Sequence, residues 1–414
     1  MTWEPLASSW REVDVNVADL WAASGAQWLT SPGVAVPSKL VRSLAGIVEM
    51  LDERGAGLEQ VSTARGVGLV AERAAAVGLM PSSDISCGGA SRLLQAADGW
   101  LAVSLARDAD VEMVPAWLDL DGGAVPADRL WNVVADEVAD RAGVELEERA
   151  ALLGLPVALV GHTAPRAAGC AVRVDRRGHA PPSTVEGLVV VNLASLWAGP
   201  LCADVLARLG ADVITVESTG RPDGARRTQR FFESLHGRSR SVALDLGEAG
   251  GRRRLRELLQ CADIVIEGSR PRALEQMGVH AQAVLATGPR VWASITAHGR
   301  DLPHGLRTGF GDDAAVAGGL VGRVGDRPVF LADAIGDPVG GLVAAASVIE
   351  VVERGGRCLI DVSLAHAAAS MVTVGEATVG PSDVSARPST RRDPGGPMPL
   401  GRDTDEVLRQ FGLR

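Results

Sequence analysis

Short apolar runs and helical segments alternate regularly over residues 187–296 of the chain. The runs LVVVNL, DVITVE, SVALDL, DIVIEG and RVWASIT are typical of buried strands, and PLCADVLARLG, RRRLRELLQCA and RALEQMG between them have helical spacing. This alternation predicts an α/β fold with a Rossmann-like parallel sheet covered by helices. Ligands of such sheets bind beyond the carboxyl ends of the strands, which places the loop SLWAG, Glu217 and the loop GSRP at the expected binding edge.

The rest of the chain has a different pattern and predicts further units. Residues 1–84 are largely helical, and residues 85–163 combine a glycine pair, a DGW strand and helices, which favours a smaller α+β domain. Residues 164–186 are rich in Arg, Gly and Pro and are typical of a linker. We expect residues 187–414 to form the Rossmann-like domain with a C-terminal tail.

A faint internal repeat relates the two ends of the chain. SLAGIVEMLDERGAG at 43–57 aligns with VAAASVIEVVERGGR at 343–357, and both contain Glu-Arg-Gly. In this register Pro37 lies opposite Asp337. The repeat fits either a chance likeness of two amphipathic helices or a degenerate half-repeat in which the first unit has lost the aspartate.

Composition excludes several classes of partner. The 414-residue chain has a net charge of −10 and scattered basic residues, so no nucleic-acid-binding surface is indicated. Lys39 is the only lysine, so phosphates must be held by arginine or by backbone N–H groups. The five cysteines are dispersed, which favours a reducing compartment. Because no signal peptide or long apolar span is recognisable, we expect a cytoplasmic protein without membrane association.

Several familiar chemistries lack their motifs. No GxGxxG follows the first strand, which disfavours a nicotinamide dehydrogenase in which Glu217 would bind ribose. A Walker loop, HExxH and GxSxG are absent as well. We therefore expect no metal site and no permanently bound cofactor.

Asp337 lies between Gly336 and Pro338, just before the apolar run LVAAASVIEVV. Read locally, it is a helix N-cap, with Pro338 at the first helical position. The N-terminus of a helix also favours an ionised carboxylate, which is the form that a nucleophile needs. The local pattern leaves both roles open, and Asp333, four residues upstream, is the natural comparison.

Several segments of residues 187–414 together resemble the class III CoA-transferases, the CaiB/BaiF family. VVNLASLWAGPLCADVLARLGADVITVES is similar to the family's opening strand, loop, helix and strand, and RSRSVALDLGEAGGRRRLRELLQCADIVIEGSRPRALEQMGV to the segment that follows. LADAIGDPVGGLVAAASVIEVVERGGRCLIDVSLAHAA resembles the stretch with the catalytic aspartate, and GGPMPLGRDTDEVLRQFGL the carboxyl terminus. The resemblance implies a CoA-transferase that moves CoA from an acyl-CoA to a carboxylic acid, through an aspartyl anhydride and an aspartyl-CoA thioester.

The resemblance also implies roles for individual residues. Asp337 matches the nucleophile, and Gly88 and Gly89 match a mobile loop that closes over the intermediate. Coenzyme A and acyl-CoA are then substrates. The residues implied to bind CoA are Ser195, Leu196, Trp197, Ala198, Arg238, Arg240, Gly268, Ser269, Arg270 and Met277.

The order of the segments departs from that of the family. The small α+β domain precedes the Rossmann-like domain, which suggests a permuted order or a truncated duplication. The resemblance implies an interlocked homodimer. A non-catalytic CoA-binding subunit or scaffold of the same fold is the alternative. An acyl-CoA racemase is disfavoured because its catalytic histidine falls at Phe310, which cannot transfer a proton.

Overall fold

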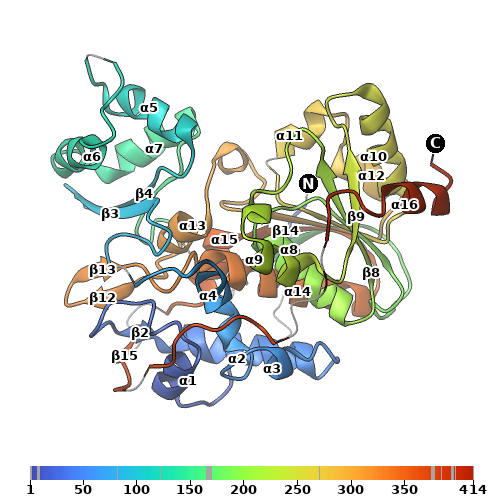
Figure 1. Ribbon diagram of the computed structural model, residues 1–414, viewed down its shortest axis with the longest axis horizontal. Coiled ribbons are helices and arrows are strands. Elements are labelled where there is room, and N and C mark those ends of the chain that lie inside the picture. The colour runs from blue at the N-terminus through green and yellow to red at the C-terminus, as the bar shows by residue number, and fades with distance from the viewer. Residues whose placement is uncertain are drawn as a thin grey trace.

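The computed structural model of the chain describes residues 2–6, 10–81, 83–121, 123–164, 170–269, 271–373, 378–383, 385–392, 396 and 398–413. Figure 1 shows a large sheet with helices on both faces and, beside it, a smaller sheet with its own helices. A third group of helices, from the N-terminal part of the chain, lies below the smaller sheet in this view.

An eight-stranded sheet forms the centre of the described structure. Its strands are, in spatial order, β1 (Glu4–Leu6), β6 (Val172–Gly178), β14 (Arg357–Ser363), β11 (Val291–Thr296), β10 (Ile264–Glu267), β7 (Val189–Asn192), β8 (Asp212–Ser218) and β9 (Arg240–Leu244). The strands from β14 to β9 are parallel, whereas β6 is antiparallel to β14 and β1 is antiparallel to β6. The mostly parallel sheet expected from the alternation is therefore confirmed.

Both faces of this sheet are buried under helices. Successive residues of a strand point to opposite sides, so neighbouring residues of one strand pack into different core clusters. Val190 packs into the cluster with α8 (Ala198–Arg208) and α14 (Gly336–Arg354), and Val191 packs into the cluster with α10 (Ala249–Cys261), α12 (Ala281–Thr287) and α16 (Thr404–Gln410). The remaining elements of this part are α9 (Gln229–His236), α11 (Pro271–Gln276), α13 (Gly311–Ala317), α15 (Leu364–Ser370), the hairpin β12 (Gly322–Val324) and β13 (Arg327–Val329), and 3-10 turns at Gly224–Arg227 and His304–Leu306.

The close contact of α8 with α14 depends on a glycine. A Cβ atom on Gly341 would lie 2.6 Å from the carbonyl oxygen of Ala198, which is closer than real Cβ contacts come. The small residue therefore lets the N-terminus of α8, directly after the loop 195–197, approach the first turns of α14.

The smaller sheet consists of β3 (Ser91–Ala96), β4 (Gly99–Ser104) and β5 (Val157–Leu159), all antiparallel. It packs against α5 (Asp108–Leu118), α6 (Leu130–Ala139) and α7 (Gly143–Leu153) around its own core, which contains Leu101, Trp117 and Val134. Its other face meets α13, where the N–H of Gly161 donates to the carbonyl of Val316 at 2.9 Å. These contacts hold the smaller unit against the region around the start of α14.

The N-terminal helices α1 (Val17–Ala23), α2 (Ser38–Asp52), α3 (Leu58–Val61) and α4 (Glu72–Val77), with a 3-10 turn at Val67–Ala71, share one hydrophobic core with α14. The short strand β2 (Val36–Pro37) pairs antiparallel with β15 (Thr378–Val379). A buried ion-pair network ties this part to the C-terminal half, because the guanidinium of Arg391 bonds Glu72 at 2.6 and 2.7 Å and Asp204 at 2.5 Å.

One segment differs from the expectation. Residues 172–178, which the composition of residues 164–186 assigned to a linker, form β6 between β1 and β14. Val172 and Val174 point into the core, in a stretch where arginine and aspartate are interspersed. The charged residues between them concealed the period of two that marks a strand.

Candidate active site

Asp337 lies in the first turn of α14, two positions further into the helix than the local pattern predicts. The helix begins at Gly336, and its N-cap is Ile335, whose side chain makes no capping hydrogen bond. The N–H of Asp337 donates to the carbonyl of Ala334 at 2.9 Å. The prediction that Asp337 is the N-cap is therefore wrong, and its carboxylate is left for other contacts.

Four groups determine the charge of Asp337. Burial raises the pKa of its carboxyl group to about 7, the guanidinium of Arg73 opposes this rise, and the carboxylates of Asp312 and Asp333 add to it. The backbone N–H of Gly311 donates to the carboxylate and favours its ionised form. The sequence pattern predicts the opposite direction, from the helix N-terminus alone. Burial and two like charges outweigh that effect.

Gly311 is required by the close approach of two segments. A Cβ atom at this position would lie 2.5 Å from Oδ2 of Asp337 and 2.4 Å from the carbonyl oxygen of Ala334. Only a glycine leaves room for the carboxylate to rest against the first residue of α13. This contact brings the N-terminus of α13 to the N-terminus of α14.

A second pair of buried acids begins α13. Asp312 accepts a hydrogen bond from Ser91 at 3.2 Å and one from the N–H of Ala334 at 3.1 Å. Asp313 accepts from the N–H of Phe310 at 2.9 Å and from Ser104 at 3.2 Å. Burial raises the pKa of Asp312 to about 6 and that of Asp313 to about 7.

Arg73, at the start of α4, is the cation of this acidic cluster. Its Nε donates to Oδ2 of Asp333 at 2.8 Å, and its Nη2 bonds the other oxygen of the same carboxylate. The guanidinium also lies 5.8 Å from the centre of the Trp197 ring. Arg73 therefore connects the region of Asp337 with the loop at the end of β7.

The predicted glycine loop lies beside the same arginine. A Cβ atom on Gly88 would be 3.6 Å from Nη2 of Arg73, and the thiol of Cys87 contacts the carbonyl of Ala332 at 3.1 Å. Gly89 has a φ of +76°, a conformation that glycine adopts readily, with open space at its Cβ position. Both glycines are exposed, next to the segment that leads to Asp337.

The predicted CoA loop after β7 reaches this site through Trp197. The Trp197 side chain is buried and packs edge-on against Phe231, with ring centres 5.3 Å apart. Ser195 and Leu196 are exposed, and Ala198 begins α8. Leu196 has a φ of +70°, and its N–H donates to Asp223 at 3.1 Å. The loop thus presents backbone at its tip and anchors itself by the tryptophan.

The other predicted CoA contacts are more dispersed. Arg238 is ion-paired with the buried Asp204 at 3.2 Å, and Arg240 donates to Asp212 at 3.0 Å. Gly268 and Ser269 follow β10, and Met277 follows α11 and packs on the second core cluster. Arg270 lies outside the described residues. The structure therefore groups Asp337, Gly88 and Trp197 around Arg73, and it engages Arg238 and Arg240 in ion pairs.

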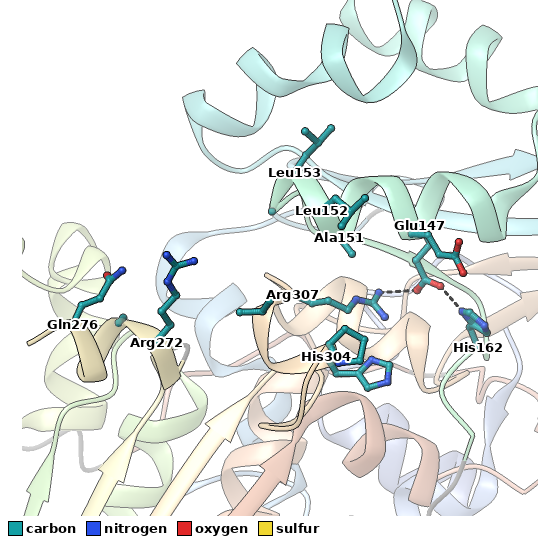
Figure 2. Close-up of a pocket in the computed structure, with 14 residues that line it drawn as sticks. Glu147, Ala151, Leu152, Leu153, His162, Arg272, Gln276, His304 and Arg307 are labelled. Atoms are coloured by element: carbon teal, nitrogen blue, oxygen red, sulfur yellow. Dashed lines mark hydrogen bonds and ion pairs between the residues drawn. The ribbon is translucent and has the colours of Figure 1, made fainter. Parts of the chain in front are cut away.

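A cavity with a volume of about 830 Å³ lies between α7 and the segments that follow β10 and β11. Figure 2 shows Arg307 and His162 on either side of Glu147 at this cavity, with Arg272 and Gln276 on the opposite wall. Arg307 donates to Glu147 at 2.7 Å and so joins the smaller unit to the large sheet. Of the predicted site residues that the structure describes, none lines this cavity.

Sequence reasoning missed Arg73, Asp312 and the role of Asp333. Asp333 is fully buried and bonded by Arg73, so it is not the neutral comparison that its place in the sequence suggests. Asp312 lies in the stretch RTGFGDD at 307–313, directly after Phe310 and Gly311, and the run of two acids after a glycine was the only signal available. Glu217 is buried and bonds Arg226 at 2.8 Å, which leaves it unsuited to bind a ribose.

The sheet and its strand-end loops place the chain among Rossmann-like α/β proteins. A sequence model of CoA-transferase family III matches residues 185–398, just over half of the chain. The chain belongs to this family. Its described residues contain no cluster of three His, Cys, Asp or Glu side chains placed to hold a metal ion.

Curated relatives carry related names. An acyl-CoA transferase of Fusarium pseudograminearum is 27% identical over 160 residues, which cover 34% of this chain and 35% of the relative. The succinyl-CoA–D-citramalate CoA-transferase of Chloroflexus aurantiacus is 29% identical over 177 residues, which cover 40% of this chain and 44% of the relative. The chain thus spans less than half the length of these relatives.

A crystal structure of a CaiB/BaiF family protein from Brucella suis is 29% identical in sequence. The match covers 46% of this chain and 55% of that protein, with a TM-score of 0.40. In the parts of the chain that the structure describes, no helix combines the length and apolarity needed to span a bilayer.

Proposed function

We propose that the protein transfers CoA from an acyl-CoA to a carboxylic acid, with Asp337 as the nucleophile. A carboxylate oxygen of Asp337 attacks the thioester carbonyl carbon, the carbon–sulfur bond breaks, and CoA leaves as a thiolate. The thiolate then attacks the aspartyl carbonyl of the anhydride, releasing the donor acid and forming an aspartyl-CoA thioester. The acceptor carboxylate attacks the aspartyl carbonyl carbon, the carbon–sulfur bond breaks, and CoA thiolate leaves, which forms a second anhydride between the acceptor and Asp337. The thiolate then attacks the acceptor carbonyl carbon, the anhydride C–O bond breaks, and the acceptor leaves as its CoA thioester while the carboxylate of Asp337 is regenerated.

The observation that supports this proposal best is the position of Asp337 within the matched family segment. It lies at the start of α14, against Gly311, and four residues before Gly341, which packs against Ala198 at the start of α8. Its pKa of about 7 makes a substantial fraction anionic at neutral pH, and a carboxyl group of higher pKa is a stronger nucleophile once ionised. Phe310, next to Gly311, offers no second proton-transfer group, which disfavours racemisation.

The loops around Asp337 suit the binding of CoA and the exclusion of water. We assign CoA binding to the backbone of Ser195 and Leu196 and to the start of α8 at Ala198, where the N-terminus of a helix favours anions. Gly88 and Gly89 would close over the intermediate, because glycine lets backbone approach it closely. Gly268, Ser269, Arg270 and Met277 would border the nucleotide. Arg238 and Arg240 would need to exchange their carboxylate partners to reach a phosphate.

The division of the chain into an N-terminal segment, a small domain and a Rossmann-like domain stays a prediction, and so do the homodimer and the cytoplasmic location. Light scattering at micromolar concentration measures the assembly directly. A dimer mass supports the family-type assembly, and a monomer mass contradicts it.

The decisive experiment traps the aspartyl intermediate. The purified protein is incubated with succinyl-CoA, the donor in the name of the Chloroflexus relative, and with a panel of other short acyl-CoA thioesters, in the presence of hydroxylamine. Peptide mass spectrometry should find an aspartyl hydroxamate at residue 337. Asp337→Asn should remove the adduct and lower transfer by several orders of magnitude.

Asp326→Asn is the matched control, because Asp326 lies exposed in the turn between β12 and β13. This variant should keep both the adduct and the activity. If no adduct forms with any donor while CoA still stabilises the protein against heat, the chain is a non-catalytic CoA-binding relative. If CoA neither binds nor reacts, the proposal fails altogether.

A further inference from the structure

Arg73 comes from the N-terminal half of the chain, yet it lies in the acidic cluster of the C-terminal half. Its guanidinium bonds both oxygens of Asp333, which is fully buried, and its own side chain is 30% exposed. The neighbouring residue Glu72 points elsewhere, since both of its carboxylate oxygens bond Arg391. The contact of α4 with the cluster is therefore made by Arg73 itself.

The charges that face Asp337 are unbalanced without this arginine. Asp312 faces it from the start of α13, Asp333 from the segment before α14, and Arg73 from α4, while Gly311 contributes a backbone N–H. Three carboxylates thus share one guanidinium. The carboxylates in turn raise the pKa of Arg73 despite its burial, so Arg73 stays cationic throughout the working range of pH.

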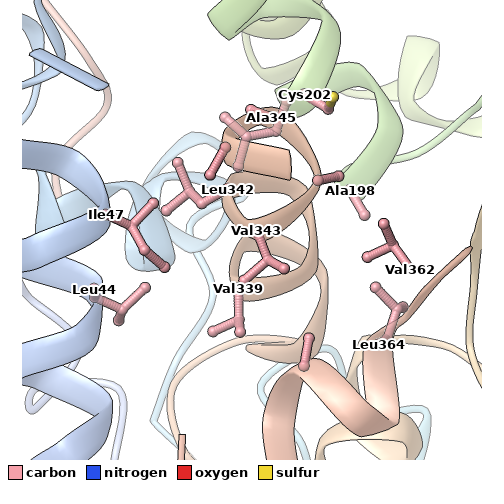
Figure 3. Packing of buried hydrophobic residues seen from close by; sticks show 14 of the residues in the cluster. Leu44, Ile47, Ala198, Cys202, Val339, Leu342, Val343, Ala345, Val362 and Leu364 are labelled. Carbon is pink, nitrogen blue, oxygen red and sulfur yellow. The ribbon is translucent and has the colours of Figure 1, made fainter. Parts of the chain in front are cut away.

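Arg73 follows a segment that packs in the same hydrophobic core as α2 and α14, since this core contains the 3-10 turn Val67–Ala71 and Ala74 of α4. Figure 3 shows Leu44 and Ile47 of α2 facing Val339, Leu342 and Val343 of α14. At the far ends of the same helices, Arg54 donates to Glu353 at 2.7 Å, a pair that joins the two Glu-Arg-Gly motifs of the internal repeat. The two halves of one chain therefore meet along related helices, next to the site.

We propose that Arg73 is the positioning residue of the candidate nucleophile, a cation that the N-terminal half supplies within the same chain to keep Asp337 ionised. This inference rests on the proposed function for its catalytic meaning. The effect of Arg73 on the charge of Asp337 does not depend on the proposed function, because this charge can be measured without any substrate. Arg73 acts through Asp337 and Asp333 and forms no bond with the reacting atoms.

The test measures the titration of Asp337 by carbon-13 NMR of protein labelled at the aspartate carboxyl carbon. The resonance of Asp337 is the one that is lost in Asp337→Asn. Arg73→Gln should raise the titration midpoint by about one unit or more, the usual effect of a nearby opposite charge. Asp333→Asn should lower it, since a like charge is removed and Arg73 remains. Arg73→Lys should keep the midpoint close to that of the unaltered protein.

Arg73→Gln alone leaves Asp333 buried without its partner, which strongly destabilises the fold. The double variant Arg73→Gln with Asp333→Asn removes both charges of the pair and keeps the fold testable. Its midpoint should still rise, by less than in Arg73→Gln, because the effect of Arg73 on Asp337 exceeds that of Asp333. If Arg73 had only a structural role, Arg73→Gln and Asp333→Asn would not shift the titration midpoint of Asp337 in opposite directions.

The outcomes separate this inference from the proposed function. Opposite shifts in Arg73→Gln and Asp333→Asn support the inference, even in a protein without transferase activity, which would refute only the proposed function. An Asp337 midpoint that is unchanged in the folded double variant overturns the inference. If transfer is active, its pH profile should move with the NMR midpoint in each variant, and a profile that stays in place overturns the positioning role.

Discussion

Replacing Asp337 with asparagine should make the protein more stable at high pH. The unfolded chain ionises this carboxyl group at its ordinary pKa of 3.8, whereas the folded protein ionises it at about 7. Between these values the folded protein binds the additional proton. The stability of the protein with Asp337 is therefore undiminished below about pH 4 and falls as the pH rises through 7.

The magnitude follows from the shift of about three units, at about 1.36 kcal/mol per unit, which sets an upper bound of about 4 kcal/mol. Asp337 is only partly buried, so solvent screens some of this free energy and a gain of about 2 to 4 kcal/mol is expected above pH 8. Asparagine keeps the shape of the side chain and can still accept the N–H of Gly311. Asparagine removes the charge that burial, Asp312 and Asp333 disfavour.

The assay is urea unfolding of both proteins at several pH values from 4 to 8.5. The difference in unfolding free energy should be near zero at pH 4 and largest at pH 8.5. Most of its rise should take place between about pH 4 and 7. Asp326→Asn should show no such trend, because Asp326 is exposed. A loss of stability in Asp337→Asn at pH 8.5, or a gain that is independent of pH, would refute the account of Asp337's environment.

Three further results are expected. The rate of CoA transfer should increase with pH through a midpoint near 7, as Asp337 ionises, and a rate that declines through the same range would contradict the nucleophile assignment. Arg391→Met should lower the unfolding free energy by about 3 to 5 kcal/mol in urea, because Glu72 and Asp204 would remain buried without their shared cation. Gly311→Ala should lower the unfolding free energy by about 1 to 3 kcal/mol and displace Asp337. Gly250→Ala, at an open position in α10, should do neither, and equal effects of the two substitutions would refute the close contact at Gly311.

The fold of the C-terminal half was largely predictable from the sequence. Its strands are short apolar runs separated by amphipathic helices, and this pattern determines which faces are buried. The order of the strands and the antiparallel additions β6 and β1 were not predictable in this way. An edge strand needs only one buried face, and in β6 that face is formed by Val172 and Val174 between charged residues.

The exact start of α14 shows a similar limit. An aspartate followed by proline is a frequent capping pattern, but here the chain turns earlier, at Ala334 and Ile335. The turn is set by the contact of Gly336 with the carbonyl of Gly311, where a Cβ atom would be 2.5 Å away. A contact between segments 25 residues apart outweighs the local preference, so propensity alone places the boundary one or two residues from its position.

The part of the site that the sequence could not reveal is its charge balance. Each acid of the cluster stands near the others in sequence, between Asp312 and Asp337, but their counter-ion lies 260 residues from Asp333. An arginine on a short helix has no local feature that distinguishes it from a solvated surface residue. Its side chain reaches the cluster because the N-terminal helices share one core with α14, and the faint repeat between α2 and α14 was the trace of this packing in the sequence. The candidate nucleophile was therefore proposed from its motif, whereas the residue proposed to control its ionisation could be found only in the tertiary structure.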